Sequence, residues 1–187
     1  MDPRVDRRDE AFALARLADE AGLDLVACQD HPYYRLDGAR PGPLPDRPVP
    51  VWVGSYGRRM LTIIGRDADG WTPSNSYAPP DRIPEMQAAV DRAAEDAGRD
   101  PRSVRRNYNV MGVLDVDAVR RDGEQLTGPV DHWVDTLSRY VEDLGFDAFV
   151  FWPREGDTAA QARAFAEQVV PRLRDRFGDD LRRAAGG

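Results

Sequence analysis

The residues best suited to chemistry lie in one short stretch, between Val51 and Trp71. It begins Val-Trp-Val-Gly-Ser-Tyr-Gly-Arg-Arg and ends Gly-Trp, which predicts a buried strand, a glycine-bearing turn, a helix with a basic start and a second short strand. Glycine allows a backbone to come close to an anion, and the first N–H groups of a helix have no partner inside it. The pattern predicts a phosphate site, although an ordinary tight turn with solvated arginines explains it equally well. The candidate binding residues are Gly54, Ser55, Tyr56, Gly57, Arg58 and Arg59.

His31 is the candidate for proton transfer. It follows an apolar run from Leu23 to Cys28 that reads as a buried strand, and Pro32 ends that strand because it has no N–H to donate. A neutral imidazole at a strand end can act as an acid or a base near pH 7. The alternative is a histidine at the rim that only hydrogen-bonds a loop.

Two tryptophans and a second histidine are further candidates for a site. Trp71 and Trp152 lie at strand ends where a planar ring could stack, but core packing is the more common role of such a tryptophan. His132 comes at a helix start, and we expect it to be exposed. With so few histidines and no carboxylate pair at ligand spacing beside one, we expect no metal site.

The elements that position these residues alternate between strand and helix. Strands are expected over 23–28, 49–53, 68–72, 104–116 and 146–152, and helices over 8–21, 57–65, 84–97, 130–144 and 158–177. Repeated strand–helix units indicate a parallel sheet covered by helices. About five strands are expected, whereas a closed (β/α)8 barrel has eight. The pattern therefore predicts an α/β fold with about five parallel strands, fewer than a closed barrel needs.

Length and composition favour one domain. The chain has 187 residues and 41% hydrophobic content, which suffices for a buried core. We expect a single domain over residues 1–178 and a flexible tail over 179–187.

Charge and residue usage exclude several classes of function. The net charge of -7 argues against binding nucleic acid or an anionic membrane. No apolar run is long enough to span a bilayer and no signal peptide is evident, so we expect a cytoplasmic protein. The single cysteine, Cys28, cannot form a disulfide within the chain. Lysine is absent, which excludes Schiff-base chemistry, a covalently held pyridoxal cofactor and a Walker-type phosphate loop.

Three stretches together resemble the luciferase-like monooxygenases, a family of flavin- or F420-dependent oxidoreductases. They are Leu17–Leu25 running into Gln29–Tyr33, Pro50–Gly54 continuing to Gly70–Trp71, and Gly145–Asp147 continuing to Trp152–Pro153. The resemblance implies a TIM barrel that binds FMN or F420 at the C-terminal ends of its strands, for monooxygenation or hydride transfer. It also implies that His31 is the catalytic residue, that residues 54–59 hold the cofactor phosphate and that Trp71 contributes to cofactor binding.

The chain departs from the family pattern by an internal shortening. It starts at a helix, and it passes from Asp30–Tyr33 directly to a segment resembling the one before the family's fifth strand. Sequences resembling the first, third and fourth strands are missing, so the resemblance implies a truncated TIM-barrel-like α/β fold with about five parallel strands. The strand over 23–28 then loses both expected neighbours, and an apolar strand with free edges tends to pair with another chain. We therefore expect a homo-oligomer that completes the sheet.

The resulting hypothesis is an oxidoreductase that acts on a small molecule through FMN or F420. Its main rival is a non-catalytic relative that binds flavin or phosphate, or serves as an oligomeric scaffold. A hydrolase using Ser55 and His31 is the other rival. It is disfavoured because Val53 stands where the nucleophile-elbow pattern needs glycine.

Overall fold

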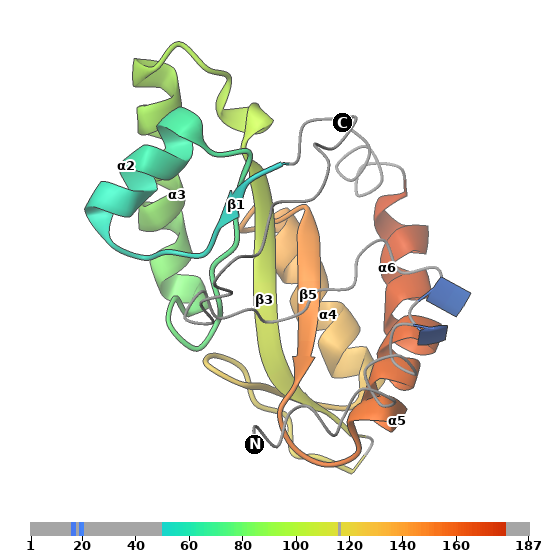
Figure 1. Cartoon of the computed structure of the whole chain (residues 1–187). Coiled ribbons are helices and arrows are strands. Elements are labelled where there is room, and N and C mark those ends of the chain that lie inside the picture. The colour runs from blue at the N-terminus through green and yellow to red at the C-terminus, as the bar shows by residue number, and fades with distance from the viewer. Residues whose placement is uncertain (1–15, 18, 21–49, 116, 179–187) are drawn as a thin grey trace, which may run out of the picture.

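The computed structural model describes residues 16–17, 19–20, 50–115 and 117–178 (Figure 1). Its strands are β1 (Trp52–Val53), β2 (Gly70–Trp71), β3 (Arg105–Leu114), β4 (Leu126–Gly128) and β5 (Ala148–Pro153). Its helices are α2 (Arg58–Asp67), α3 (Ile83–Asp96), α4 (Val130–Glu142), α5 (Thr158–Ala164), the π-helical η4 (Phe165–Val169) and α6 (Val170–Phe177), with short 3-10 turns η2 (Pro80–Arg82) and η3 (Pro101–Ser103).

The sheet is parallel throughout and is organised around the long strand β3. Strand β1 pairs with β2, β2 pairs with the start of β3, and β5 pairs with β3 along its opposite edge. Strand β4 pairs with the last three residues of β3. The N–H of Arg105 donates to the Asp69 carbonyl beside β2, and the N–H of Asp115 donates to the Gly128 carbonyl of β4. Because these two residues are an even number of positions apart, their N–H groups point to the same edge of β3, so β4 lies on the same edge as β2. The C-terminal ends of all these strands therefore lie toward one end of the sheet.

Asn75 fills the gap that separates β2 from β4 along this edge. Its side chain is fully buried, its Oδ1 accepts from the N–H of Met111 at 2.9 Å, and its Nδ2 donates to the Met111 carbonyl at 3.1 Å. One amide side chain thus supplies the two hydrogen bonds that a strand residue would supply.

Helices cover one face of the sheet. Figure 1 shows α4 behind β3 and β5, with α2 and α3 on one side and α5 and α6 on the other. Side chains alternate between the faces of a strand, and the even-numbered residues of β3, such as Tyr108 and Val110, are buried on the helical side. Tyr108 stacks on Phe146 with ring centroids 4.4 Å apart, and Trp71 lies beside Phe146 at 6.5 Å. These rings form the centre of the core.

The predicted α/β fold with about five parallel strands is confirmed, but one of the five differs. The strand expected over 23–28 lies outside the described residues, and the fifth strand is β4, which the sequence pattern did not predict. With three residues, β4 is too short to show an alternating pattern. The helix expected over 158–177 is also divided, because Pro171 cannot donate a backbone hydrogen bond and the preceding turn widens into η4.

Two buried tyrosines provide a matched test of the core. The Tyr108 hydroxyl donates to the Ala78 carbonyl at 2.6 Å, whereas the Tyr140 hydroxyl is buried without a hydrogen-bond partner among the described residues, and burial raises the pKa of Tyr140 to about 12. We expect Tyr108→Phe to lower the free energy of unfolding by about 1 kcal/mol. Tyr140→Phe removes an unsatisfied group, so it should leave stability unchanged or increase it by up to about 1 kcal/mol. Urea denaturation checks both, and equal losses in the two variants would contradict the assigned hydrogen bonding.

Candidate cofactor-binding site

The turn between β1 and α2 is held against the end of β2 by three contacts. A Cβ on Gly54 would lie 3.1 Å from the Thr72 carbonyl, so only glycine allows this approach without displacement. The indole N–H of Trp71 donates to the Ser55 carbonyl at 2.9 Å. The Tyr56 hydroxyl accepts from the N–H of Ser74 at 3.2 Å. The backbone conformation of the turn is thus fixed by the neighbouring strand.

The first turn of α2 has unused donors. Its N-cap, Gly57, supplies no side chain to cap the helix, and the first turn contains no acidic residue. The Gly57 carbonyl accepts from Met60 and Leu61, whereas the N–H groups of Arg58 and Arg59 donate to no other described residue. Both arginine side chains are exposed.

This arrangement fits an anionic group. A Cβ placed on Gly57 would meet no described residue within 4 Å, so none of these residues blocks the approach at this N-cap. A helix N-terminus carries about half a positive elementary charge, and the two guanidinium groups add to it. A phosphate oxygen could accept hydrogen bonds there without facing a carboxylate of the same turn. The structure therefore brings together residues 54–59, which the sequence predicted as the phosphate site.

Trp71 is placed in the core. Its side chain is 0% exposed and packs beside Phe146, so it offers no free ring face to a cofactor. Its contact with the Ser55 carbonyl gives it a positioning role in the turn. Trp152 is half-buried on β5, in register with Met111 of β3.

The two histidines have different outcomes. His31, the predicted catalytic residue, lies outside the described residues, as does Cys28. The expectation that His132 is exposed is wrong, because His132 is only 9% exposed and its Nε2 lies 2.9 Å from a carboxylate oxygen of Asp122. Its position two residues into α4 places it under the loop that leads to β4.

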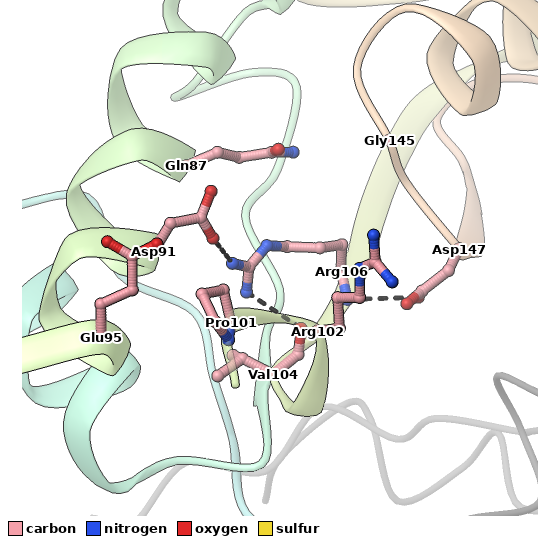
Figure 2. A pocket seen from close by; sticks show the side chains of 9 residues that line it. All are labelled: Gln87, Asp91, Glu95, Pro101, Arg102, Val104, Arg106, Gly145 and Asp147. Atoms are coloured by element: carbon pink, nitrogen blue, oxygen red, sulfur yellow. Dashed lines mark hydrogen bonds and ion pairs between the residues drawn. The ribbon is translucent and has the colours of Figure 1, made fainter. Parts of the chain in front are cut away.

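A cavity lies at the other end of the sheet, near the start of β3. It has a volume of about 420 Å³ and is lined by Gln87, Asp91, Glu95, Pro101, Arg102, Val104, Arg106, Gly145 and Asp147 (Figure 2). The Arg106 side chain is almost fully buried and is already bonded to the Asp91 carboxylate and the Val104 carbonyl. Binding sites of open α/β sheets lie at the C-terminal strand ends. We therefore assign this cavity to the packing of α3 on the sheet.

Asp147 in this cavity predicts a pH dependence of stability. Burial raises the pKa of its carboxyl above the usual 3.8, and the smaller attraction of Arg105, 3.4 Å away, opposes the shift. Because the folded chain holds this proton more tightly than the unfolded chain, the free energy of unfolding should fall as pH rises through 3.8 toward the higher folded pKa. The free energy of unfolding of the parent minus that of Asp147→Asn should therefore decrease over that pH window. Urea denaturation at several pH values tests this, and an increasing difference would contradict it.

Sequence reasoning missed a row of polar side chains on the face of the sheet opposite the helices. Thr72, Asn107 and Asn109 are joined there by hydrogen bonds. The signal was present, because asparagines two residues apart in a strand share one face. The strand over 104–116 alternates only weakly, which masks this polar face in the sequence.

Comparison with known proteins identifies the family. The family model for luciferase-like monooxygenases matches residues 31–118. On these residues, the chain belongs to the luciferase-like monooxygenase family. Curated relatives and solved structures that resemble the chain agree with this family and with the fold.

Curated relatives are longer than this chain. It is 31% identical over 175 residues to a phthiodiolone/phenolphthiodiolone dimycocerosates ketoreductase of Mycobacterium kansasii, which covers 91% of this chain and 44% of that protein. It is 25% identical over 185 residues to an F420-dependent glucose-6-phosphate dehydrogenase of Microbacterium testaceum, covering 78% of this chain and 54% of that protein. The chain thus spans about half the length of these luciferase-like relatives.

Solved structures share the fold. An F420-dependent secondary alcohol dehydrogenase in complex with an F420-acetone adduct superposes with a TM-score of 0.62 at 16% identity, over 94% of this chain and 64% of that one. The tetrahydromethanopterin reductase of Methanopyrus kandleri, which depends on coenzyme F420, gives a TM-score of 0.57 at 13% identity, over 67% of this chain and 51% of that one. Among the described residues of this luciferase-like chain, no helix is long and apolar enough to cross a membrane.

Proposed function

We propose that this chain binds the phosphate of FMN or F420 at the start of α2 and acts as an oxidoreductase on a small molecule. The observation that carries the proposal is the first turn of α2, which has free N–H groups, two exposed arginines and no acidic residue. The turn follows β1, at the end of the sheet where ligands bind in α/β folds. The named activities of the F420-dependent relatives support the same class of chemistry.

Each residue of the turn has a defined task in this proposal. The N–H groups of Arg58 and Arg59 donate to the phosphate, and their guanidinium groups balance its charge. Gly57 leaves the approach open. Trp71 and Tyr56 keep the turn in place through their hydrogen bonds. When bound, the flavin-type ring supplies hydride transfer or, with oxygen, monooxygenation.

His31 completes the proposal as the residue that transfers a proton at the substrate. Its assignment comes from the family resemblance and from the strand-end position in the sequence. An imidazole is suited to this role near neutral pH.

A non-catalytic relative is the second candidate. It is favoured by the burial of Trp71, which is 0% exposed and so leaves no ring face on which a cofactor could stack. Such a protein would bind flavin or phosphate, or serve as a homo-oligomeric scaffold in which a second copy completes the sheet. Its mass in solution would exceed that of one chain.

Titration of the full chain with FMN and with F420, followed by ring fluorescence, tests the proposed function. We expect saturable binding of one of the two, weakened by excess inorganic phosphate. Turnover of alcohols with oxidised FMN or F420, and of ketones with the reduced cofactor, then separates the enzyme from the non-catalytic relative. Absence of binding of both cofactors at millimolar concentration would overturn the proposal.

A further inference from the structure

The loop that leads from β3 to β4 contains an aspartate followed directly by a glycine, Asp122 and Gly123. In such a pair the backbone nitrogen of the glycine can attack the side-chain carboxyl of the aspartate, because no side chain on the glycine hinders the approach. The cyclic imide that forms takes up water and opens to an aspartyl or an isoaspartyl linkage. The pair is therefore a candidate for covalent rearrangement of the main chain.

The backbone of this pair is free to react. The Gly123 N–H donates to no other described residue, and a Cβ on Gly123 would meet none of them within 4 Å. Its φ of +101° lies in the region that glycine favours. The Asp122 side chain is 47% exposed, so water reaches it. Among the described residues, the nitrogen has no hydrogen bond to break and no neighbour to displace before it attacks.

Two basic side chains of α4 contact the Asp122 carboxylate. Nε2 of His132 lies 2.9 Å from one carboxylate oxygen, and Nη2 of Arg139 lies 3.1 Å from the other. Gly128 allows the imidazole this position, because a Cβ there would lie 2.7 Å from Cδ2 of His132. A positive charge beside a carboxyl group draws electrons from its carbon, and a protonated imidazole can give its proton to a departing oxygen as a general acid. The contacts therefore favour attack on this carboxyl.

We propose that Asp122 rearranges to isoaspartate and that His132 is the general acid of the first step. The Gly123 nitrogen bonds to Cγ of Asp122, and its proton passes through solvent to the departing carboxylate oxygen. The His132 imidazolium supplies the second proton, and the oxygen leaves as water. Water then adds to the main-chain carbonyl of the imide, and the bond from that carbonyl to the Gly123 nitrogen breaks. The product is an isomer of the starting chain, so no oxidant or reductant is consumed.

The rearrangement releases the loop from α4. The carboxylate moves from the side chain to the main chain, so its contacts with His132 and Arg139 are lost. The same loop is joined to the segment after β2, where the Gly123 carbonyl accepts from Nδ2 of Asn75 at 3.3 Å. The result is a loop that loosens with age at the C-terminal end of the sheet. This inference does not depend on the proposed function.

A second aspartate–glycine pair, Asp69–Gly70, provides an internal control. The Gly70 N–H donates to the Val51 carbonyl at 3.3 Å, and a Cβ on Gly70 would lie 2.8 Å from the Trp52 ring. Oδ2 of Asp69 accepts from the Val51 N–H at 2.7 Å. Gly70 is also paired with both β1 and β3. The backbone cannot turn its nitrogen toward the carboxyl without breaking these contacts.

Storage of the full chain near neutral pH, followed by proteolysis, chromatography and electron-transfer fragmentation of the peptides, measures isoaspartate at each position. In the folded chain it should form at least about tenfold faster at Asp122 than at Asp69. In concentrated urea the two rates should become similar. Equal rates in the folded chain would overturn the site, and a difference that persists in urea would assign it to local sequence and contradict the role of the fold.

His132→Gln tests the general acid. Its amide N–H can still hydrogen-bond Asp122 but cannot release a proton, so the rate at Asp122 should fall by about tenfold while the rate at Asp69 stays the same. An unchanged rate at Asp122 in a variant with the circular dichroism of the parent would overturn the role of His132. His132→Asn replaces His132→Gln if that variant does not fold.

Discussion

A Gly112→Ala variant should lose about 3 kcal/mol or more of its free energy of unfolding. A Cβ on Gly112 would lie 1.9 Å from the Leu126 carbonyl oxygen and 2.7 Å from the Trp133 ring. The first neighbour is backbone of β4, which cannot move aside as a flexible side chain does. The methyl group would force β3 and β4 apart and would displace Trp133, which is fully buried.

Urea denaturation followed by tryptophan fluorescence measures this loss. Gly57→Ala is the matched control, because its φ of -79° is accessible to alanine and its Cβ would meet nothing within 4 Å. It should change stability by less than about 1 kcal/mol, the usual range for an N-cap exchange. Equal stabilities of Gly112→Ala and the parent would show that β4 does not pack on β3 as the structure describes.

Reversing both charges at the start of α2 should reduce FMN or F420 affinity by about 30-fold, which corresponds to about 2 kcal/mol. In Arg58→Glu/Arg59→Glu, two exposed cations beside the free N–H groups become anions. Each substitution exchanges an attraction to phosphate for a repulsion of similar size. Stability should change little, because neither arginine side chain forms a hydrogen bond or ion pair with another described residue.

The charge-matched control is Arg66→Glu/Arg102→Glu. These two exposed arginines lie at the other end of the sheet, so the variant makes the same change in net charge at a distance from the turn. It should bind the cofactor within about threefold of the parent, since long-range effects are screened at physiological salt. Equal weakening in both double variants would assign the effect to net charge and contradict the local site.

The helices and the long strands were predictable from sequence because their patterns extend over many residues. α3 and α4 each carry an apolar stripe over about four turns, and β5 is a continuous apolar run. Strand β4 has three residues, and Asn75 replaces a strand residue with a side chain. Local patterns contain no information on such long-range pairings.

The part of the candidate site that depends on backbone N–H groups and charged side chains was predictable from sequence. Glycines followed by arginines at a helix start describe the α2 turn directly. The burial of Trp71 was not predictable, since a strand end gives no indication of which face its side chain occupies. In the row of Thr72, Asn107 and Asn109, Thr72 lies 35 and 37 positions before the two asparagines, so only the pairing of β2 with β3 brings them together.

Amide NMR spectra of the isotope-labelled full chain, recorded during addition of FMN and F420, test the phosphate site most directly. Saturable shifts of the Arg58 and Arg59 N–H signals, reproduced by inorganic phosphate at higher concentration, are the expected result. If a cofactor binds while these two signals stay in place, the phosphate is held elsewhere and the assignment of the α2 turn is wrong.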